Sequence, residues 1–258
     1  MTKILERNIP ELEAMKKYPK SIFYRGNLSL LERPKVSIVG ARRTSSYTKQ
    51  LTAALSRALS KRGVCIVSGA AMGVDTAAHI GAGADNTIAV VANGLDIKYP
   101  ATNRDLIENI EEKGLMMSQF EDGVQNRAWT FVVRNEIVVA LGDILVVAEA
   151  DLNSGSMRSV AFALAMKKEI WVLPHRMNES LGTQALLKSG DAKQILDIEA
   201  FASRFGKATE SSVPKDEFFC FCQTSPTLDE AIDKYKERVY EEELGGTITI
   251  DNGIVMLT

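Results

Sequence analysis

Short, mostly apolar runs recur along the first three quarters of the chain. Longer segments separate them, and in these the apolar residues follow a helical spacing. A run of four to six apolar residues is typical of a strand that is covered on both faces. The runs predict strands at 36–39, 64–68, 87–92, 115–118, 144–148 and 170–173.

The segments between these runs predict helices at about 46–62, 74–83, 103–113, 132–142, 156–168 and 180–189. Alternation of strands and helices implies an α/β fold with a parallel sheet and helices on both of its faces. Ligands of such sheets bind beyond the carboxyl ends of the strands. The loops that follow the strands are therefore where we expect a binding site.

The pattern changes at both ends of the predicted sheet. Residues 1–34 indicate a short helical cap, and the main domain is expected to span 35–206. Residues 207–216 are small and polar, as in a linker. Two helices and a hairpin then predict a small winged-helix-like domain at 217–258, with the hairpin turn at Asp251-Asn252-Gly253.

Composition places the chain among soluble globular proteins. It has 258 residues, of which 45% are hydrophobic and 25% charged. No apolar run is long enough to span a membrane, and the N-terminal segment lacks the apolar core of a secretory signal. We therefore expect a cytoplasmic protein without a membrane partner.

The chain contains three cysteines and two histidines. Cys220 and Cys222 are too close for an easy disulfide, and two histidines offer little for a zinc site. Cys65, Cys220 and Cys222 are interpreted as buried thiols in a reducing compartment.

Charge is distributed unevenly, although the net charge is only −2. Residues 25–62 contain nine Lys/Arg and one acidic residue, whereas residues 210–243 contain ten acidic residues and four basic ones. A protein with one basic region can bind a polyanion locally. The same charges would also suit a solvated surface without a ligand.

The loop after the first predicted strand has the chemistry of a phosphate site. Gly40 permits a sharp turn, and Thr44, Ser45 and Ser46 are candidate N-caps for the next helix. Free N–H groups at a helix N-terminus favour an anion, and Arg42 and Arg43 each match a phosphate bidentately.

A second loop, SGAAMGVDTAAH at 68–79, offers a close backbone approach to a ligand at Ser68, Gly69 and Gly73. The same residues would also suit a plain tight turn. Neither loop contains the GxGxxG fingerprint, which argues against NAD. Ser154, Gly155 and Ser156 begin another helix and form a third candidate anion site.

Residues 126–143 interleave arginines with aromatic residues. Arg127 and Arg134 flank Trp129 and Phe131, a combination that suits single-stranded nucleic acid because bases stack on rings while arginines contact phosphates. For Trp129, a place in the hydrophobic core is an equally good interpretation.

Taken together, the loops are similar to those of the DNA-processing protein A (DprA/Smf) family, in a compact form of the epsilonproteobacterial type. The matching stretches fall within residues 36–190 and are specific as a set: SIVGARRTSSY, SGAAMGVDTAAH, NGLDIKYPATN, Phe131 to Asn135 as F-x-x-R-N, EADLNSGSM and VLPHRMNESLGT.

The resemblance implies an extended Rossmann-like domain that binds single-stranded DNA and commonly forms a homodimer. It further implies protection of incoming DNA in natural transformation, loading of the RecA recombinase, no cofactor and no catalytic activity. Carried onto this chain, the DNA site would comprise Arg42, Arg43, Ser68, Gly69, Gly73, Phe131, Arg134, Asn135, Ser154, Gly155 and Ser156.

This chain departs from the family pattern in two places. Glu136 replaces the second arginine of R-N-R, so an acidic side chain could oppose phosphate there. His175 follows Pro174 where many members have glycine.

Other functions remain open at this stage. One is a nucleotide-processing enzyme similar to phosphoribohydrolases, for which Glu149 and Asp151 are the best-placed acids. Another is a scaffold that acts through its acidic C-terminal domain alone.

Overall fold

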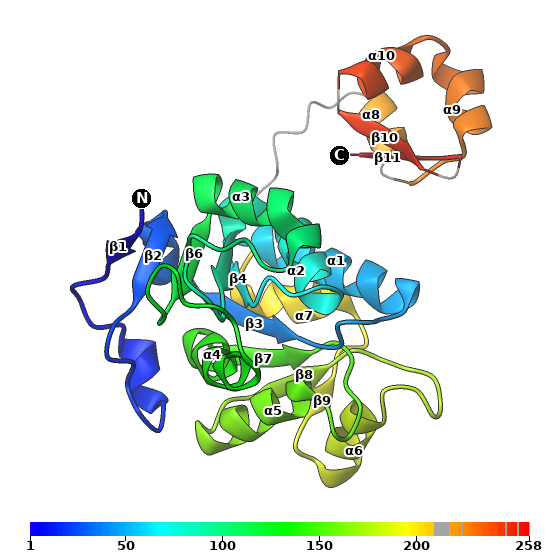
Figure 1. Ribbon diagram of the computed structural model, residues 1–258. Coiled ribbons are helices and arrows are strands. Elements are labelled where there is room, and N and C mark those ends of the chain that lie inside the picture. The colour runs from blue at the N-terminus through cyan, green and yellow to red at the C-terminus, as the bar shows by residue number, and fades with distance from the viewer. Residues whose placement is uncertain (209–216, 223, 246, 252, 258) are drawn as a thin grey trace. The chain divides into compact units, whose positions relative to one another are not determined.

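A computed structural model describes residues 1–208, 217–222, 224–245, 247–251 and 253–257. The chain forms two compact units, residues 1–209 and 210–258 (Figure 1). The first unit holds the large sheet and the second a small helical bundle with a hairpin. The predicted linker at 207–216 lies mostly outside the described residues, as does Asn252 of the predicted hairpin turn.

Nine strands of the first unit form one sheet in the order β1-β2-β6-β5-β4-β3-β7-β8-β9. From β6 to β9 all neighbours are parallel, whereas β1 and β2 pair antiparallel at one edge. The strands are β1 Lys3–Ile4, β2 Phe23–Gly26, β3 Lys35–Val39, β4 Cys65–Ser68, β5 Thr87–Val90, β6 Leu115–Ser118, β7 Ile144–Val147, β8 Ile170–Val172 and β9 Lys193–Gln194.

Helices cover both faces of this sheet, so the predicted α/β class is confirmed (Figure 1). They are α1 Ser46–Ser60, α2 Val74–Ala82, α3 Arg104–Lys113, α4 Ala128–Leu141, α5 Gly155–Ala165, α6 Leu181–Ser189 and α7 Ile198–Ala202. Short 3₁₀ turns complete the unit: η1 Pro10–Ala14, η2 Leu28–Glu32, η3 Ala84–Asn86, η4 Ala101–Asn103 and η5 Ser203–Phe205.

The alternation of side chains along each strand divides the core into two layers. Val36 and Ile38 of β3 pack with α1, α2 and α7, whereas Val39 packs with α4, α5 and α6 on the opposite face. Successive side chains of a strand point to opposite faces of the sheet, so a strand that is buried at every position contributes side chains to both layers of the core.

The N-terminal segment differs from the predicted helical cap. It contributes strands β1 and β2 and two 3₁₀ turns, and β2 hydrogen-bonds along β6. The antiparallel edge extends the sheet by two strands that the apolar pattern did not indicate, because β2 (FYRG) is only partly buried.

The second unit contains α8 Glu217–Cys222, α9 Leu228–Tyr235, α10 Arg238–Leu244 and the antiparallel pair β10 Ile248–Asp251 and β11 Ile254–Leu257. Helices followed by a hairpin match the predicted winged-helix-like order. The described residues form three helices before the hairpin instead of the expected two, because Lys236, with a positive φ of 52°, separates α9 from α10.

Cys65 and Cys222 are buried free thiols, as predicted, while the side chain of Cys220 lies outside the described part. Within the described ranges, no helix is long and apolar enough to cross a membrane. The same residues contain no cluster of three or more His, Cys, Asp or Glu side chains that could hold a metal ion.

Candidate functional site

A cavity of about 530 Å³ opens at the carboxyl ends of β3 and β7. The chain adds strands to one side of β3 up to β6 and then to the other side from β7, so the strand order reverses between β3 and β7. Ligands of open α/β sheets bind at such a switch point. The loops after β3 and β4, helix α4 and the start of α5 line the cavity.

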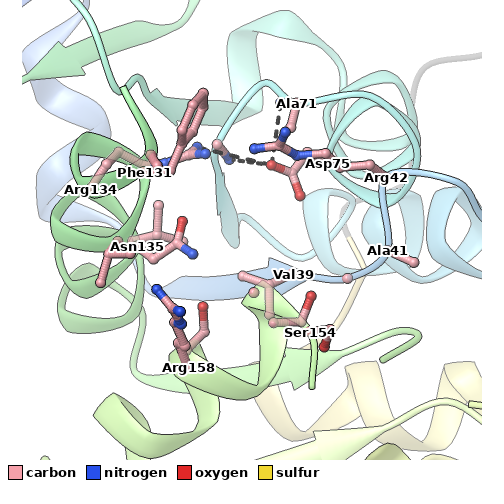
Figure 2. A pocket seen from close by; sticks show the side chains of 18 residues that line it. Val39, Ala41, Arg42, Ala71, Asp75, Phe131, Arg134, Asn135, Ser154 and Arg158 are labelled. Carbon is pink, nitrogen blue, oxygen red and sulfur yellow. Dashed lines mark hydrogen bonds and ion pairs between the residues drawn. The ribbon is translucent and has the colours of Figure 1, made fainter. Parts of the chain in front are cut away.

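Arg42 and Phe131 form one wall of this cavity (Figure 2). The Arg42 guanidinium carbon lies 4.7 Å from the centre of the Phe131 ring, a cation–π distance. On its other side Phe131 contacts Tyr99, with ring centres 6.1 Å apart. A charged donor is thereby held beside an aromatic face, while Arg42 itself stays exposed.

Arg134 lies beneath this wall and is 4% exposed. Its Nη1 donates to the carbonyl of Val90 at 2.9 Å and lies 4.0 Å from an Asp75 carboxylate oxygen. Its buried Nε has no hydrogen-bond partner among the described residues. Burial lowers the pKa of Arg134, yet a guanidinium stays charged at neutral pH.

Gly69 makes room for this buried arginine. A Cβ at position 69 would lie 1.4 Å from Nη1 of Arg134, which no packing adjustment short of moving the guanidinium would relieve. Gly69 therefore contributes to the site by allowing close contact between the β4 loop and α4, in addition to lining the cavity.

Asp75 is the single carboxylate in the described lining of the cavity. It accepts the backbone N–H groups of Gly69 at 3.2 Å and Ala71 at 3.3 Å. Burial raises the pKa of Asp75, while the Arg134 charge and the two amides act in the opposite direction. The carboxylate thus holds the β4 loop and balances the charge of Arg134.

The N-terminus of α5 faces the same cavity. Ser154 is its N-cap and accepts the N–H of Met157 at 3.4 Å, whereas the N–H groups of Gly155 and Ser156 have no acceptor within the helix at this positive helix end. Gly155, Ser156 and the exposed Arg158 also line the cavity. Three arginines, one helix N-terminus and a single carboxylate give the pocket an excess of positive charge.

A small apolar cleft of about 20 Å³ adjoins the cavity and shares Arg42, Gly69, Ala71 and Phe131 with it. Tyr99 and the exposed Met72 line its outer side. The cleft has room for about one water molecule, so a base beside the anion site would have to contact Phe131 from the main cavity.

The structure brings eight of the predicted site residues together around the cavity: Arg42, Gly69, Phe131, Arg134, Asn135, Ser154, Gly155 and Ser156. Arg43, Ser68 and Gly73 do not line it. Arg43 is exposed outside the lining, and the buried Ser68 hydroxyl donates to the carbonyl of Ile38 at 2.7 Å.

Gly73 does not line the cavity but packs against the loop that carries Arg42. Its φ is 80°, and a Cβ there would lie 2.4 Å from the carbonyl oxygen of Ala41 and 2.6 Å from that of Arg42. The glycine therefore lets the start of α2 approach the loop that carries Arg42. Because an L-residue is strained at this φ, position 73 is suited to glycine on two counts.

Sequence reasoning missed two charged residues of the lining, Asp75 and Arg158. An acid six residues after Gly69 in a glycine-rich turn could have indicated a carboxylate that holds the loop through its backbone amides. Arg158 follows Ser154 by four residues, which places both on one face of α5.

Glu136 lies away from the cavity. Its Oε1 accepts the backbone N–H of Lys16 at 3.0 Å, so it fastens the N-terminal segment to α4. Glu149 hydrogen-bonds to the Thr44 hydroxyl and is likewise absent from the described lining. His175 contacts the carbonyl of Ala148 through Nε2 at 2.7 Å.

The fold and the pocket together define a Rossmann-like α/β protein with a basic, ring-lined cavity at its switch point. The chain belongs to the DNA recombination-mediator protein A family, whose sequence profile matches residues 1–206. This confirms the resemblance that the loop motifs indicated.

Curated relatives match about two thirds of the chain. DNA processing protein DprA of Streptococcus pneumoniae is 35% identical over 176 residues, which is 67% of this chain and 62% of the relative. Protein Smf of Escherichia coli is 34% identical over 186 residues, 70% of this chain and 50% of the relative. The chain thus spans only part of these relatives' length.

Two solved structures share the fold. DNA processing protein A from Helicobacter pylori, in a structure concerned with its single-stranded DNA binding mode, is 39% identical with a TM-score of 0.77. The match covers 79% of this chain and 95% of that one. DprA from Streptococcus pneumoniae is 31% identical with a TM-score of 0.72, covering 80% and 74%.

Proposed function

We propose that the first unit binds single-stranded DNA in the cavity at the carboxyl ends of β3 and β7 and does not break bonds in the DNA. The observation that carries the proposal is the buried Arg134, whose unpartnered Nε lies in a pocket that Arg42 and Arg158 also line. The solved structure of the Helicobacter pylori relative concerns its single-stranded DNA binding mode, which supports this assignment.

The contacts predict how the strand would be held. Phosphates would meet Arg42, Arg158 and the start of α5, and a base would stack beside Phe131. Because these donors would contact the sugar–phosphate backbone of the DNA, the preference for particular base sequences should be weak. Affinity should fall as salt rises, with a slope of about 0.7 for each phosphate that is neutralised on a single strand.

Arg42→Ala and Arg158→Ala test the site, with fluorescence anisotropy of labelled oligothymidine as the readout. Each should weaken binding about tenfold or more, because a hydrogen bond to a charged group contributes about 1.5–3 kcal/mol. Arg57→Ala is the matched control. Arg57 is an exposed arginine in the last turn of α1, and α1 runs back from the carboxyl edge of the sheet.

Arg43→Ala separates two versions of the site. If only the residues lining the cavity contact the strand, Arg43→Ala should behave as Arg57→Ala does. If the strand extends over the β3 loop, its loss of affinity should approach that of Arg42→Ala. Equal affinity of the unsubstituted protein for oligothymidine and for duplex of the same length would remove the single-strand assignment.

A cellular role follows from family membership. We infer that the protein protects incoming single strands during natural transformation, acts as a homodimer and helps load the RecA recombinase. The rate of RecA assembly on a single strand, with and without this protein, tests the loading step. Sedimentation across a range of concentrations tests the dimer.

A nucleotide-processing activity is the second candidate, because the cavity joins an anion site to the aromatic ring of Phe131. Its acid or base would have to be Asp75, and that carboxylate already accepts two amides beside Arg134. We expect no free base when the protein is incubated with nucleoside monophosphates. Release of base that Asp75→Asn abolishes would favour this candidate.

A further inference from the structure

Trp129 is a large aromatic residue that the cavity does not use. It stands in the first turn of α4 and is 55% exposed. Its ring packs edge-on against Phe120, with centres 5.6 Å apart. Its position in the core, which the sequence left open, is therefore excluded, and an apolar ring remains open to solvent.

The first turn of α4 separates Trp129 from Phe131. Ala128 and Phe131 line the cavity, whereas the buried Thr130 accepts the backbone N–H of Arg127 at 2.9 Å and fixes the turn. Two residues along a helix correspond to a rotation of about 200°. Trp129 and Phe131 are thus directed to opposite sides of the same helix end.

A second depression of about 430 Å³ lies on the Trp129 side of α4. Val133, one turn after Trp129, and Phe120, its ring partner, both line it. The N-terminal segment forms the opposite side through Tyr18 and its neighbours. The exposed ring therefore stands at the edge of a second concave surface, separate from the main cavity.

Charge in this depression is balanced, with two lysines and two glutamates in its lining. Lys17 and Lys20 line the depression, and Arg127 is exposed at the start of α4. Glu121 and Glu136 also line it, but the Glu136 carboxylate is occupied by the N–H of Lys16. A polyanion that passes over the helix end would meet three cations and a solvent-exposed ring, together with the carboxylates of Glu121 and Glu136.

We propose that Trp129, supported by Phe120, is a second base-stacking site for a single strand that leaves the main cavity over the N-terminal end of α4. The proposal rests on the proposed function, since the cavity must hold the preceding nucleotides. The two sites lie on opposite sides of a helix about 10–12 Å wide, so a strand reaches both only if it is longer than the segment that the main cavity holds. Lys17, Lys20 and Arg127 contact its phosphates.

Strand length is the first variable of the test. Anisotropy is measured with oligothymidine of about 4 and about 20 nucleotides, for the unsubstituted protein, Trp129→Ala and Trp129→Phe. Trp129→Ala should weaken binding of the long strand between about 5-fold and about 150-fold, the range for loss of one stacked base. The short strand should bind as before, and Trp129→Phe should restore most of the long-strand affinity.

Fluorescence provides an independent readout, because the chain has two tryptophans. Trp171 packs on Phe201, with ring centres 4.9 Å apart, in the layer of α1, α2 and α7. Trp171→Phe keeps an aromatic ring there and leaves Trp129 as the sole fluorophore. The long strand should quench its emission at saturation, and the short strand should not.

Three outcomes would overturn the proposal. One is a long-strand affinity that Trp129→Ala leaves unchanged, with no quenching. Another is an equal loss for both strands, which would make Trp129 part of the cavity. The third is quenching that rises with protein concentration alone, which would assign the ring to contact with a second copy. If neither strand binds even the unsubstituted protein, the proposed function fails and this inference fails with it.

Discussion

Acid should destabilise the first unit through a single buried histidine. His79 is fully buried in α2, where its Nε2 accepts the N–H of Ala70 at 3.2 Å and its Nδ1 lies 2.6 Å from the Thr87 hydroxyl. That hydroxyl donates to the carbonyl of Ile66, so it must accept from Nδ1–H. The network therefore requires the neutral imidazole, since a proton on Nε2 would face the Ala70 N–H.

Burial, aided by the nearby charge of Arg134, lowers the pKa of His79 to about 3. In the unfolded chain a histidine titrates near 6.5. Between these two values the unfolded state binds more protons than the folded state, so stability is lost as pH falls below about 6.5. From pH 7 to pH 5 the free energy of unfolding should decrease by about 2 kcal/mol through this residue alone.

Urea denaturation at pH 7, 6 and 5 measures this loss for the unsubstituted protein and for His79→Gln. The glutamine variant should be less stable at pH 7 but should lose about 2 kcal/mol less on acidification, because it has no group to protonate. Taking the difference between the two proteins cancels the other titrations. These include Asp75, whose raised pKa gives the opposite pH dependence.

Protonation of His79 would also disturb the site, because it breaks the bond from the Ala70 N–H. Ala70 lies between Gly69 and Ala71, which line the cavity. Proton NMR gives a check that does not depend on unfolding, since the chain has two histidines and His79→Gln assigns their signals. An imidazole of His79 that titrates near 6.5 in the folded protein would refute the argument. So would an unfolding difference that stays constant from pH 7 to pH 5.

Three further substitutions probe the framework around the cavity. Gly69→Ala should lower the free energy of unfolding by about 1–3 kcal/mol in urea, because its Cβ overlaps the guanidinium of Arg134; unaltered stability would contradict that contact. Asp75→Asn should cost about 3–5 kcal/mol in the same assay, since it leaves Arg134 buried without its anion; a loss below about 1 kcal/mol would show the pair to be unimportant. Thr44→Val removes a hydrogen bond to Glu149 and should lower the free energy of unfolding by about 1.5 kcal/mol in urea, with unchanged stability as the result against it.

Six strands of the sheet could be predicted because their signal is local. Each is buried on both faces and so is mostly apolar, as in β7, where all four residues are apolar. Strands β1, β2 and β9 gave no such signal, since they are short or partly exposed and form by pairing with a neighbour. Pairing is a long-range property that a single stretch of sequence does not contain.

The start of α4 was predicted four residues late for a related reason. Its apolar face, at Ile137, Val138 and Leu141, indicated a helix from 132, whereas the helix begins at Ala128. The first turn carries Phe131, which lines the cavity, and Trp129, which is exposed, so it lacks the apolar spacing of a core helix. The departure from that spacing coincides with the part of α4 that we assign to ligand contact.

The candidate site could be predicted where it lies in loops and could not where it depends on burial. Arg42 and Ser154 follow strand ends, and the parallel sheet brings such loops together. The sequence does not show which of Arg42 and Arg43 lines the cavity. Adjacent side chains in a turn point in different directions, and only the turn geometry decides which one faces the cavity. The burial of Arg134 depends on Gly69 and Asp75, which lie on the loop after β4 and at the start of α2.

Buried and exposed arginines contribute differently to such a pocket. Arg134 is fixed by Val90 and Asp75 before any ligand arrives, so its charge is available without ordering a flexible side chain. Arg42 and Arg158 are exposed and lose rotamer freedom when they bind, although Arg42 already rests on Phe131. Replacing Arg134 must therefore change folding and binding together, whereas replacing Arg42 or Arg158 should change binding alone. For that reason the exposed pair, rather than the buried arginine, provides the decisive test of strand binding.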